Sequence, residues 1–247
     1  MLIHLVNPNT TASMTEKAAV AARAVAAIGT LIRADQPDDG PASIEGHYDA
    51  AFAVPGMLGR IAEAVAAGAD AHVIACFDDT GLDAARAASP KPVVGIGEAA
   101  FHVVSFLGER FSVVTTLSRS IPVIEANLGR YGLAARCARV RAAEVPVLAL
   151  EDEGSDACDR ISDEIARAIV EDRSQAIVLG CAGMTDLARR LERRHGVPVV
   201  DGVSAAVTLA EALVRLGLST SRIGGWAPPL PKPYGGIFAD RAPPPRT

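Results

Sequence analysis

The sequence predicts an α/β protein of two similar lobes. Each lobe is a parallel sheet flanked by helices, and a pseudo-twofold relates the lobes with the ligand site between them. One observation is that short β-branched runs alternate with longer alanine-rich stretches of helical period, the pattern of βαβ units. The other is an internal repeat, in which "AHVIAC", ending at Cys76, matches "AIVLGC", ending at Cys181. Further on, "PVVGIGEAA" from Pro92 matches "PVVDGVSAA" from Pro198, so each half repeats the same strands and turns.

The individual elements follow from the same pattern. Strands are expected near residues 2–7, 71–76, 92–96, 111–116, 175–180 and 197–201. Helices are expected near residues 13–28, 57–68, 81–88, 98–108, 120–131, 156–171, 184–194 and 203–216. Residues 34–50 are rich in turn formers and predict a long loop, and the proline-rich tail predicts an irregular, disordered end.

The repeat also predicts how the chain is divided. In each half a helix follows directly on the last strand, and this helix could cross over and pack against the other half. We therefore expect residues 1–97 plus 205–247 to form one lobe and residues 98–204 the other.

Composition excludes several classes of function. The net charge of −5 is spread over both signs without a basic stripe, which argues against nucleic acid or a membrane surface as a partner. No apolar run reaches the length of a membrane span and the first residues lack a basic leader, so we expect a cytoplasmic protein. The cysteines form no C-x-x-C pair and the histidines are scattered, so no metal site is expected.

The repeated cysteines are the candidate catalytic residues. Ligands of parallel α/β sheets bind beyond the carboxyl ends of the strands, where Cys76 and Cys181 are expected to meet across one cleft. A helix start beside each is expected to favour thiolate. One thiolate can then remove a proton from a carbon next to a carbonyl, while the opposite thiol returns one to the other face. Such a reaction inverts the carbon and needs no cofactor.

Other residues near the strand ends are candidates for binding the substrate and the developing enolate. Hydroxyl, amide and backbone N–H groups suit this role because they donate hydrogen bonds. The candidates are Asn9, Phe77, Asp78, Thr115, Thr116, Ala182 and Gly183.

Each of these assignments has a plainer structural alternative. A lone buried cysteine is usually a small core residue, and Cys137 and Cys158, which have no repeat partner, keep that interpretation. The Asp78 and Asp79 carboxylates could tune Cys76 or simply cap a helix.

Two further motifs are weak. Ser43 and His47 could line the pocket, although a solvated loop is the expected state. "GIGEAA", residues 95–100, loosely fits a dinucleotide motif, but the next strand ends in threonines where an acidic residue would be needed, and we reject it.

Several stretches resemble one known family. "NPNT", "ACFDDTGLDAAR", "GPASIEG", "RFSVVTTLSRSIP" and "LGCAGM" are similar to the hydantoin racemase branch of the aspartate/glutamate racemase superfamily. The resemblance runs from residue 1 to about residue 237. It implies cofactor-independent racemisation of 5-substituted hydantoins, with Cys76 and Cys181 as the acid/base pair. It also implies homo-oligomers and a chain end that returns to the first lobe.

The resemblance leaves alternatives open. Allantoin racemases share the frame, whereas arylmalonate decarboxylases keep only the second cysteine. Phe77 and Ala182 follow the two cysteines here, which fits a neutral cyclic ureide better than a charged amino acid. A two-lobed binding protein would have no use for facing thiols, and a redox protein would need them within disulfide distance. The loop of residues 41–47 and the tail near Tyr234 are expected to close over the 5-substituent.

Overall fold

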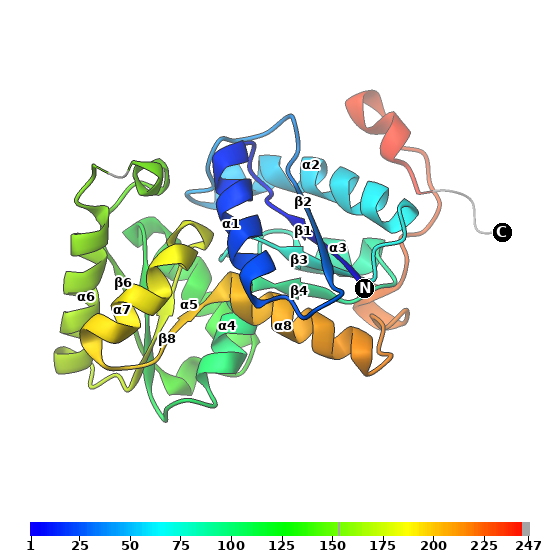
Figure 1. The fold of residues 1–247 in the computed structure, drawn as a ribbon. Coiled ribbons are helices and arrows are strands. Elements are labelled where there is room, and N and C mark those ends of the chain that lie inside the picture. The colour runs from blue at the N-terminus through cyan, green and yellow to red at the C-terminus, as the bar shows by residue number, and fades with distance from the viewer. Residues whose placement is uncertain (153, 244–247) are drawn as a thin grey trace.

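The computed structural model describes residues 1–152 and 154–243, and it contains two separate four-stranded parallel sheets (Figure 1). The strand order is β2-β1-β3-β4 in the first sheet and β6-β5-β7-β8 in the second, so the two sheets have the same topology. The strands are β1 (Leu2–Val6), β2 (Leu31–Asp35), β3 (Ala71–Ile74), β4 (Val93–Gly95), β5 (Phe111–Thr115), β6 (Cys137–Ala142), β7 (Ala176–Leu179) and β8 (Val199–Asp201). The predicted fold class is confirmed.

The two strands that the sequence analysis missed, β2 and β6, are both at a sheet edge. The central strands β3, β5 and β7 are fully buried and mostly apolar, and such runs stand out in a sequence. β2 reads "LIRAD" and β6 reads "CARVRA", with charged residues interspersed and much of each strand partly exposed. These two edge strands carry a mixed pattern because only part of their surface contacts the core.

Each sheet is covered by helices on both faces. The helices are α1 (Ala12–Val25), α2 (His47–Ala66), α3 (Leu82–Ala88), α4 (Ile96–Val104), α5 (Ile121–Arg130), α6 (Ala157–Glu171), α7 (Ala188–His195) and α8 (Gly202–Arg215). All eight expected helices are present, but α2 starts ten residues earlier than its expected start at residue 57 and takes up the end of the predicted loop. Pro55 lies inside α2 and obscured its periodic pattern.

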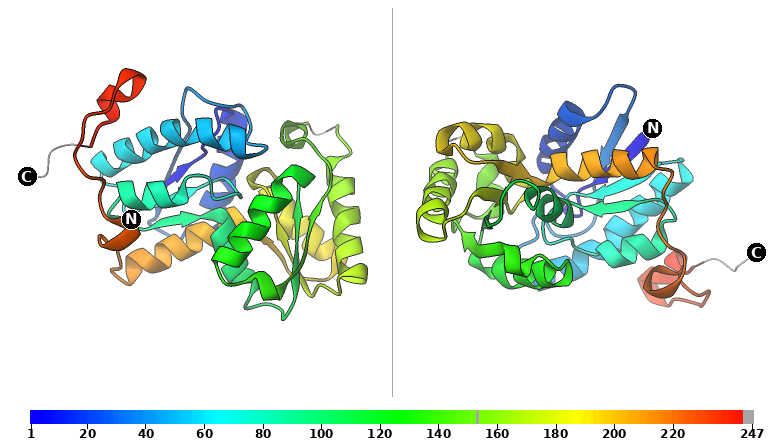
Figure 2. Two further views of the ribbon diagram at one scale, coloured as in Figure 1. Left: turned by 180° about the vertical axis from the view of Figure 1, so that it is seen from behind. Right: turned by 90° about the horizontal axis from the view of Figure 1, so that it is seen from below.

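Helices α4 and α8 cross between the halves of the chain. α4 follows β4 of the first sheet yet packs against β7 and β8 of the second, while α8 follows β8 and packs against β1, β3 and β4 of the first (Figure 2). The two helices touch where they start, since a Cβ built on Gly202 would lie 2.5 Å from the carbonyl oxygen of Ile96. These contacts support our proposal that the lobes are residues 1–97 plus 205–247 and residues 98–204.

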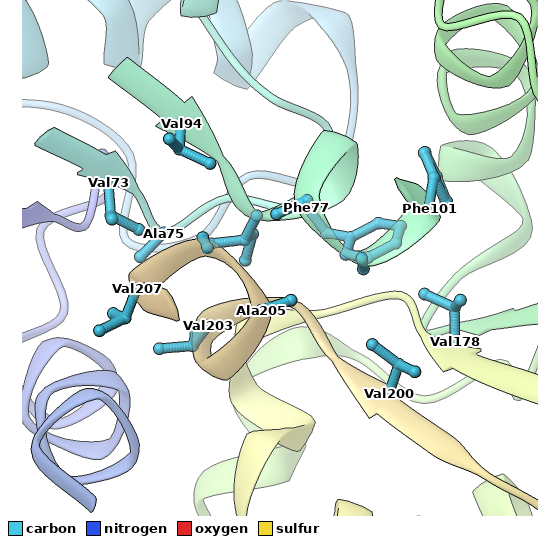
Figure 3. Close-up of a cluster of buried hydrophobic side chains, with 14 of the residues drawn as sticks. Val73, Ala75, Phe77, Val94, Phe101, Val178, Val200, Val203, Ala205 and Val207 are labelled. Atoms are coloured by element: carbon cyan, nitrogen blue, oxygen red, sulfur yellow. The ribbon is translucent and has the colours of Figure 1, made fainter. Parts of the chain in front are cut away.

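One hydrophobic cluster runs through both halves (Figure 3). Val73 and Val94 of the first sheet, Val178 of the second and Val203 of α8 all belong to it. Phe77 and Phe101 meet edge to face within it, with ring centroids 5.4 Å apart. The loop that follows Cys76 is thereby packed into the shared core.

The chain end returns to the first half. The Arg222 guanidinium donates to the carbonyl oxygens of Arg86, Ala87 and Ser89, and the Trp226 indole donates to Asp83 at 3.1 Å. The tail lies at the end of this half that is remote from the other half (Figures 1 and 2). The expectation of a disordered end falls partly on residues 244–247, which lie outside the described residues.

Candidate active site

The carboxyl ends of the central strands of both sheets surround one cavity. β1 and β3 deliver Asn9 and Cys76 from the first half, and β5 and β7 deliver Thr116 and Cys181 from the second. The full lining is Asn9, Met14, Ile44, Ala75, Cys76, Phe77, Asp78, Thr116, Ser120, Val147, Gly180, Cys181 and Ala182. Two thiols from different halves of the repeat therefore share one small site.

The Cys76 thiol lies in the loop between β3 and α3. Its Sγ is 3.3 Å from the Thr80 hydroxyl, and the backbone N–H groups of Asp78 and Thr80 point toward it. Burial nevertheless raises the pKa of this thiol to about 12, and the Asp78 charge adds to the rise. The neighbouring donors reduce this effect without cancelling it.

The Cys181 thiol lies at the N-cap of a short 3-10 helix, Ala182–Leu187. The Gly183 N–H donates to it, yet burial raises the pKa of the Cys181 thiol to about 11. The expectation that helix starts favour thiolate at both cysteines is wrong, because the loss of solvation outweighs the effect of the helix end. After Cys76 the next helix, α3, begins only at Leu82, so the thiol does not lie at a helix start.

Asp79 caps a helix, as the structural alternative predicted. The helix is α4, which is not the one that follows Asp79 in the sequence. Its carboxylate accepts from the N–H groups of Gly97 and Glu98 at 3.0 and 2.8 Å and from the Tyr131 hydroxyl at 2.7 Å. A Cβ on Gly95 would lie 2.1 Å from this carboxylate, which explains the glycines of "GIGEAA" without a dinucleotide. Asp79 thus ties the Cys76 loop to the start of α4.

The expected substrate-binding residues divide into two groups. Asn9, Phe77, Asp78, Thr116 and Ala182 line the cavity. Thr115 lies outside the lining, fully buried, and its hydroxyl donates to the Gly180 carbonyl oxygen at 3.0 Å, which joins β5 to the end of β7. Gly183 also lies outside the lining and contributes its N–H to Cys181.

Asn9 is held in place by a network at the end of β1. The Asn7 side-chain amide donates to Asn9 Oδ1 at 2.8 Å, and the Thr11 backbone N–H donates to the same atom at 2.9 Å. The Asn9 amide nitrogen is left directed at Met14 Sδ, 3.7 Å away. Asn9 can therefore offer a ligand an N–H donor more readily than an acceptor.

Sequence reasoning missed the residues that loops and backbone turns bring to the cavity. Ser120 follows β5 in "TLSRS", and this run of polar residues after a strand was the available signal. Ile44 comes from an irregular segment and Val147 from the start of a short 3-10 helix, Val147–Glu151, and neither had a signal. The two segments meet, since Glu45 Oε1 accepts from the Val147 N–H at 3.1 Å. Helix α1 holds the second segment as well, because Lys17 Nζ donates to the Leu150 carbonyl oxygen at 2.9 Å.

The predicted closing segments contribute differently from expectation. Of the loop of residues 41–47, only Ile44 lines the cavity; Ser43 and the exposed His47 do not. Tyr234 is 39% exposed and absent from the lining, so within this chain the tail does not close over the site.

We expect Ile44→Ala to change the preference among substrates that differ in the group next to the reacting carbon. The smaller side chain widens the apolar side of the cavity, and one methylene in such a pocket is worth roughly 10- to 200-fold in kcat/KM discrimination. His47→Ala is the matched control, because this residue lies in the same segment but faces solvent. Steady-state kinetics on a graded series of substituents measures both. An equal loss on every substrate would contradict the expectation.

Within residues 1–152 and 154–243, no three His, Cys, Asp or Glu side chains gather in a way that could hold a metal ion. No helix among these residues has both the length and the apolar content to cross a bilayer.

Comparison with known proteins decides the family. The sequence profile of the Asp/Glu/Hydantoin racemase family matches residues 3–210. The chain belongs to this family. A hydantoin racemase of Rhizobium meliloti is 50% identical over 236 residues, which cover 96% of this chain and 98% of that protein. As a member of the family, the protein is a racemase, an isomerase.

Solved structures of the family agree in fold. An allantoin racemase from Klebsiella pneumoniae is 48% identical, with a TM-score of 0.96 over 98% of this chain and 99% of that one. An allantoin racemase from Pseudomonas fluorescens is 46% identical, with a TM-score of 0.90 over 96% of this chain and 100% of that one. The family therefore includes relatives of nearly equal similarity that are named for two different substrates.

Proposed function

We propose that this racemase inverts the C5 carbon of 5-monosubstituted hydantoins, with Cys76 and Cys181 as the two acid/base groups. The observation that supports this most is the single cavity lined by one cysteine from each half of the repeat. A substrate carbon held between them presents one face to each thiol. Racemisation needs this arrangement, because the proton must leave from one face and return to the other.

The two proton transfers require one cysteine as a thiolate and the other as a thiol. The thiolate takes the C5 proton, the C–H electron pair moves into the ring as an enolate, and the opposite thiol protonates C5 from the other face. The product leaves the two cysteines with exchanged protonation states. Hydrogen-bond donors beside the cavity, including the Thr116 and Ser120 hydroxyls and the Asn9 amide, can stabilise the enolate oxygen.

Burial makes each cysteine a strong base once it is ionised. A thiolate whose conjugate acid has a raised pKa holds a proton more tightly, and this suits removal of a proton from a weakly acidic carbon. The same burial lowers the fraction of enzyme that holds a thiolate at neutral pH. We therefore expect kcat/KM to rise with pH well into the alkaline range.

The lining supports a neutral substrate. No Arg or Lys side chain is among the lining residues, whereas a free amino acid brings a carboxylate that needs a cation. Asp78 would repel such a carboxylate. A cyclic ureide has only N–H and carbonyl groups, which match the Asn, Thr, Ser and Asp side chains present.

Allantoin is the second candidate substrate, favoured by the two allantoin racemase structures that resemble this chain throughout. Allantoin is itself a hydantoin that carries a ureido group on C5. The reacting carbon and the thiol chemistry are therefore the same, and the two candidates differ only in the substituent.

Polarimetry on enantiopure hydantoins with alkyl and aryl substituents, on allantoin and on aspartate tests this function. We expect loss of optical rotation for at least one hydantoin and none for aspartate, without an added cofactor. Racemisation of aspartate alone would overturn the proposal. Alkyl hydantoins and allantoin can be ranked by kcat/KM, after subtraction of the spontaneous rate.

We propose further that the protein is a homo-oligomer, as the resemblance to this family implies, and that it acts in the cytoplasm. Light scattering coupled to size exclusion tests the oligomer, since a monomeric mass at assay concentration would contradict it.

A further inference from the structure

The carboxylate of Asp78 lies in the cavity and has no role in the proton transfers described above. Asp78 lines the cavity between the two cysteines, and its backbone carbonyl is held by the Asn127 amide at 3.0 Å. In the described part of the chain, no hydrogen bond or ion pair reaches the carboxylate itself. Its neighbour Asp79 differs, because three donors converge on that carboxylate.

A partly buried carboxylate without a protein donor has lost part of its hydration, which costs free energy. Burial alone accounts for the rise in the pKa of Asp78 to about 7. Above that pH the group is an ionised acceptor with all its hydrogen-bonding capacity available to the cavity.

Assistance to the thiols does not explain Asp78. Its negative charge raises the pKa of both Cys76 and Cys181, so it opposes formation of the thiolate that the reaction needs. The lining also offers it no cation. A bound ligand can supply the donor that the lining does not.

We propose that the Asp78 carboxylate accepts a hydrogen bond from a ring N–H of the substrate, and that this contact selects lactam- and ureide-type rings over free amino acids. The proposal rests on the proposed function and adds the residue that recognises the ring. Asp78 is then a substrate-binding residue of the first lobe, placed on the same loop as Cys76 and one residue beyond Phe77. The contact fixes the ring relative to the thiol on that loop.

The test combines a change in the protein with a matching change in the substrate. Asp78→Ala removes the acceptor, and methylation of N1 or of N3 of the same 5-substituted hydantoin removes one donor at a time. At pH 8.5, where Asp78 is ionised, we expect Asp78→Ala to lower kcat/KM for the parent hydantoin by roughly 10- to 100-fold. For one of the two methylated substrates the variant should cause little further loss, since the contact is already gone.

Two controls separate recognition from a general effect. Asp38→Asn removes a carboxylate that is 87% exposed and should leave all three substrates unchanged. Asp78→Asn keeps the shape but removes the charge, so its pH–activity profile should move to lower pH as the thiols become easier to ionise. A merely structural role of Asp78 would produce neither the coupling to methylation nor this shift.

Equal loss on the parent and on both methylated substrates would overturn the proposal while leaving the function intact. Absence of racemisation of every hydantoin by the wild type would instead overturn the function. In that case Asp78 is tested by binding alone. Calorimetry compares the affinity of the double variant Cys76→Ser/Cys181→Ser for the parent hydantoin with that of the same variant carrying Asp78→Ala. No change in affinity, or no binding at all, would reject its role.

Discussion

Cys76→Ala and Cys181→Ala are each expected to abolish racemisation, with losses of about 10²–10⁴-fold in rate. Either change removes the only thiol that faces one side of the substrate carbon, so protonation from that side stops. The loss is measured by polarimetry and compared with spontaneous racemisation of the same hydantoin. Both thiols have a raised pKa, about 12 for Cys76 and about 11 for Cys181, so the wild-type rate should increase with pH without a plateau near neutrality.

Each single variant should keep half of the reaction. The remaining thiolate can still remove and return a proton on its own face, so C5 hydrogen exchange in D₂O should persist for one enantiomer, with retention. The two variants should select opposite enantiomers, which NMR can follow. Cys137→Ala and Cys158→Ala are the controls and should racemise almost normally, because neither residue lines the cavity. Full activity of Cys76→Ala or Cys181→Ala would reject the two-thiol mechanism.

The second large expected effect concerns stability in acid. His72 is fully buried on β3, and its Nδ1 lies 3.1 Å from Nδ1 of His4, whose Nε2 is 2.8 Å from Asp35. His72 Nε2 has no hydrogen-bond partner among the described residues. Burial lowers the pKa of His72 to about 3, and the neighbouring His4 adds to this. The folded protein therefore keeps His72 neutral.

The sign of the pH effect follows from this depression. In the unfolded chain the pKa of histidine is about 6.5, so below that pH the unfolded state binds a proton that the folded state refuses. Stability is fully present above about pH 6.5 and falls as the pH drops toward 3, by ~1.4 kcal/mol per pH unit from this residue.

Urea unfolding between pH 7 and pH 4 measures the slope. His72→Asn keeps a donor near the position of Nδ1 but does not titrate, so its free energy of unfolding should fall less steeply with acid than that of the wild type. His102→Gln, at an exposed histidine, should retain the wild-type slope. Identical slopes for wild type and His72→Asn would show that His72 does not cause the loss of stability in acid.

The sequence predicted the parts of the molecule that depend on continuous buried segments. The other six strands were found because their apolar runs alternate with helical stretches, and the repeat located both cysteines. The edge strands β2 and β6 and the first turns of α2 were missed because Arg33, Arg141 and Pro55 interrupt the pattern that defines each element. Arg141, for example, is buried only because Asp172, Glu164 and Glu171 surround it, and those partners lie at least 23 residues away.

The candidate site was only partly predictable for a similar reason. Residues at strand ends, such as Asn9 and Thr116, could be placed because topology alone brings strand ends together. Thr115 precedes Thr116 by one residue and so projects to the other face of its strand, where it bonds to Gly180. Ile44 comes from a loop and Val147 from a short 3-10 helix, and the paths of both segments depend on contacts such as that of Glu45 with Val147.

The crossed helices α4 and α8 affect how this chain can fold during its synthesis. The strands of the first sheet have all left the ribosome once Gly95 emerges, but the helix that covers one of its faces ends only at Arg215, roughly 120 residues later. At ~5–20 residues per second, the sheet waits on the order of ten seconds with apolar side chains uncovered. We therefore expect the yield of native protein to depend on translation speed and on chaperones that bind the sheet in that interval.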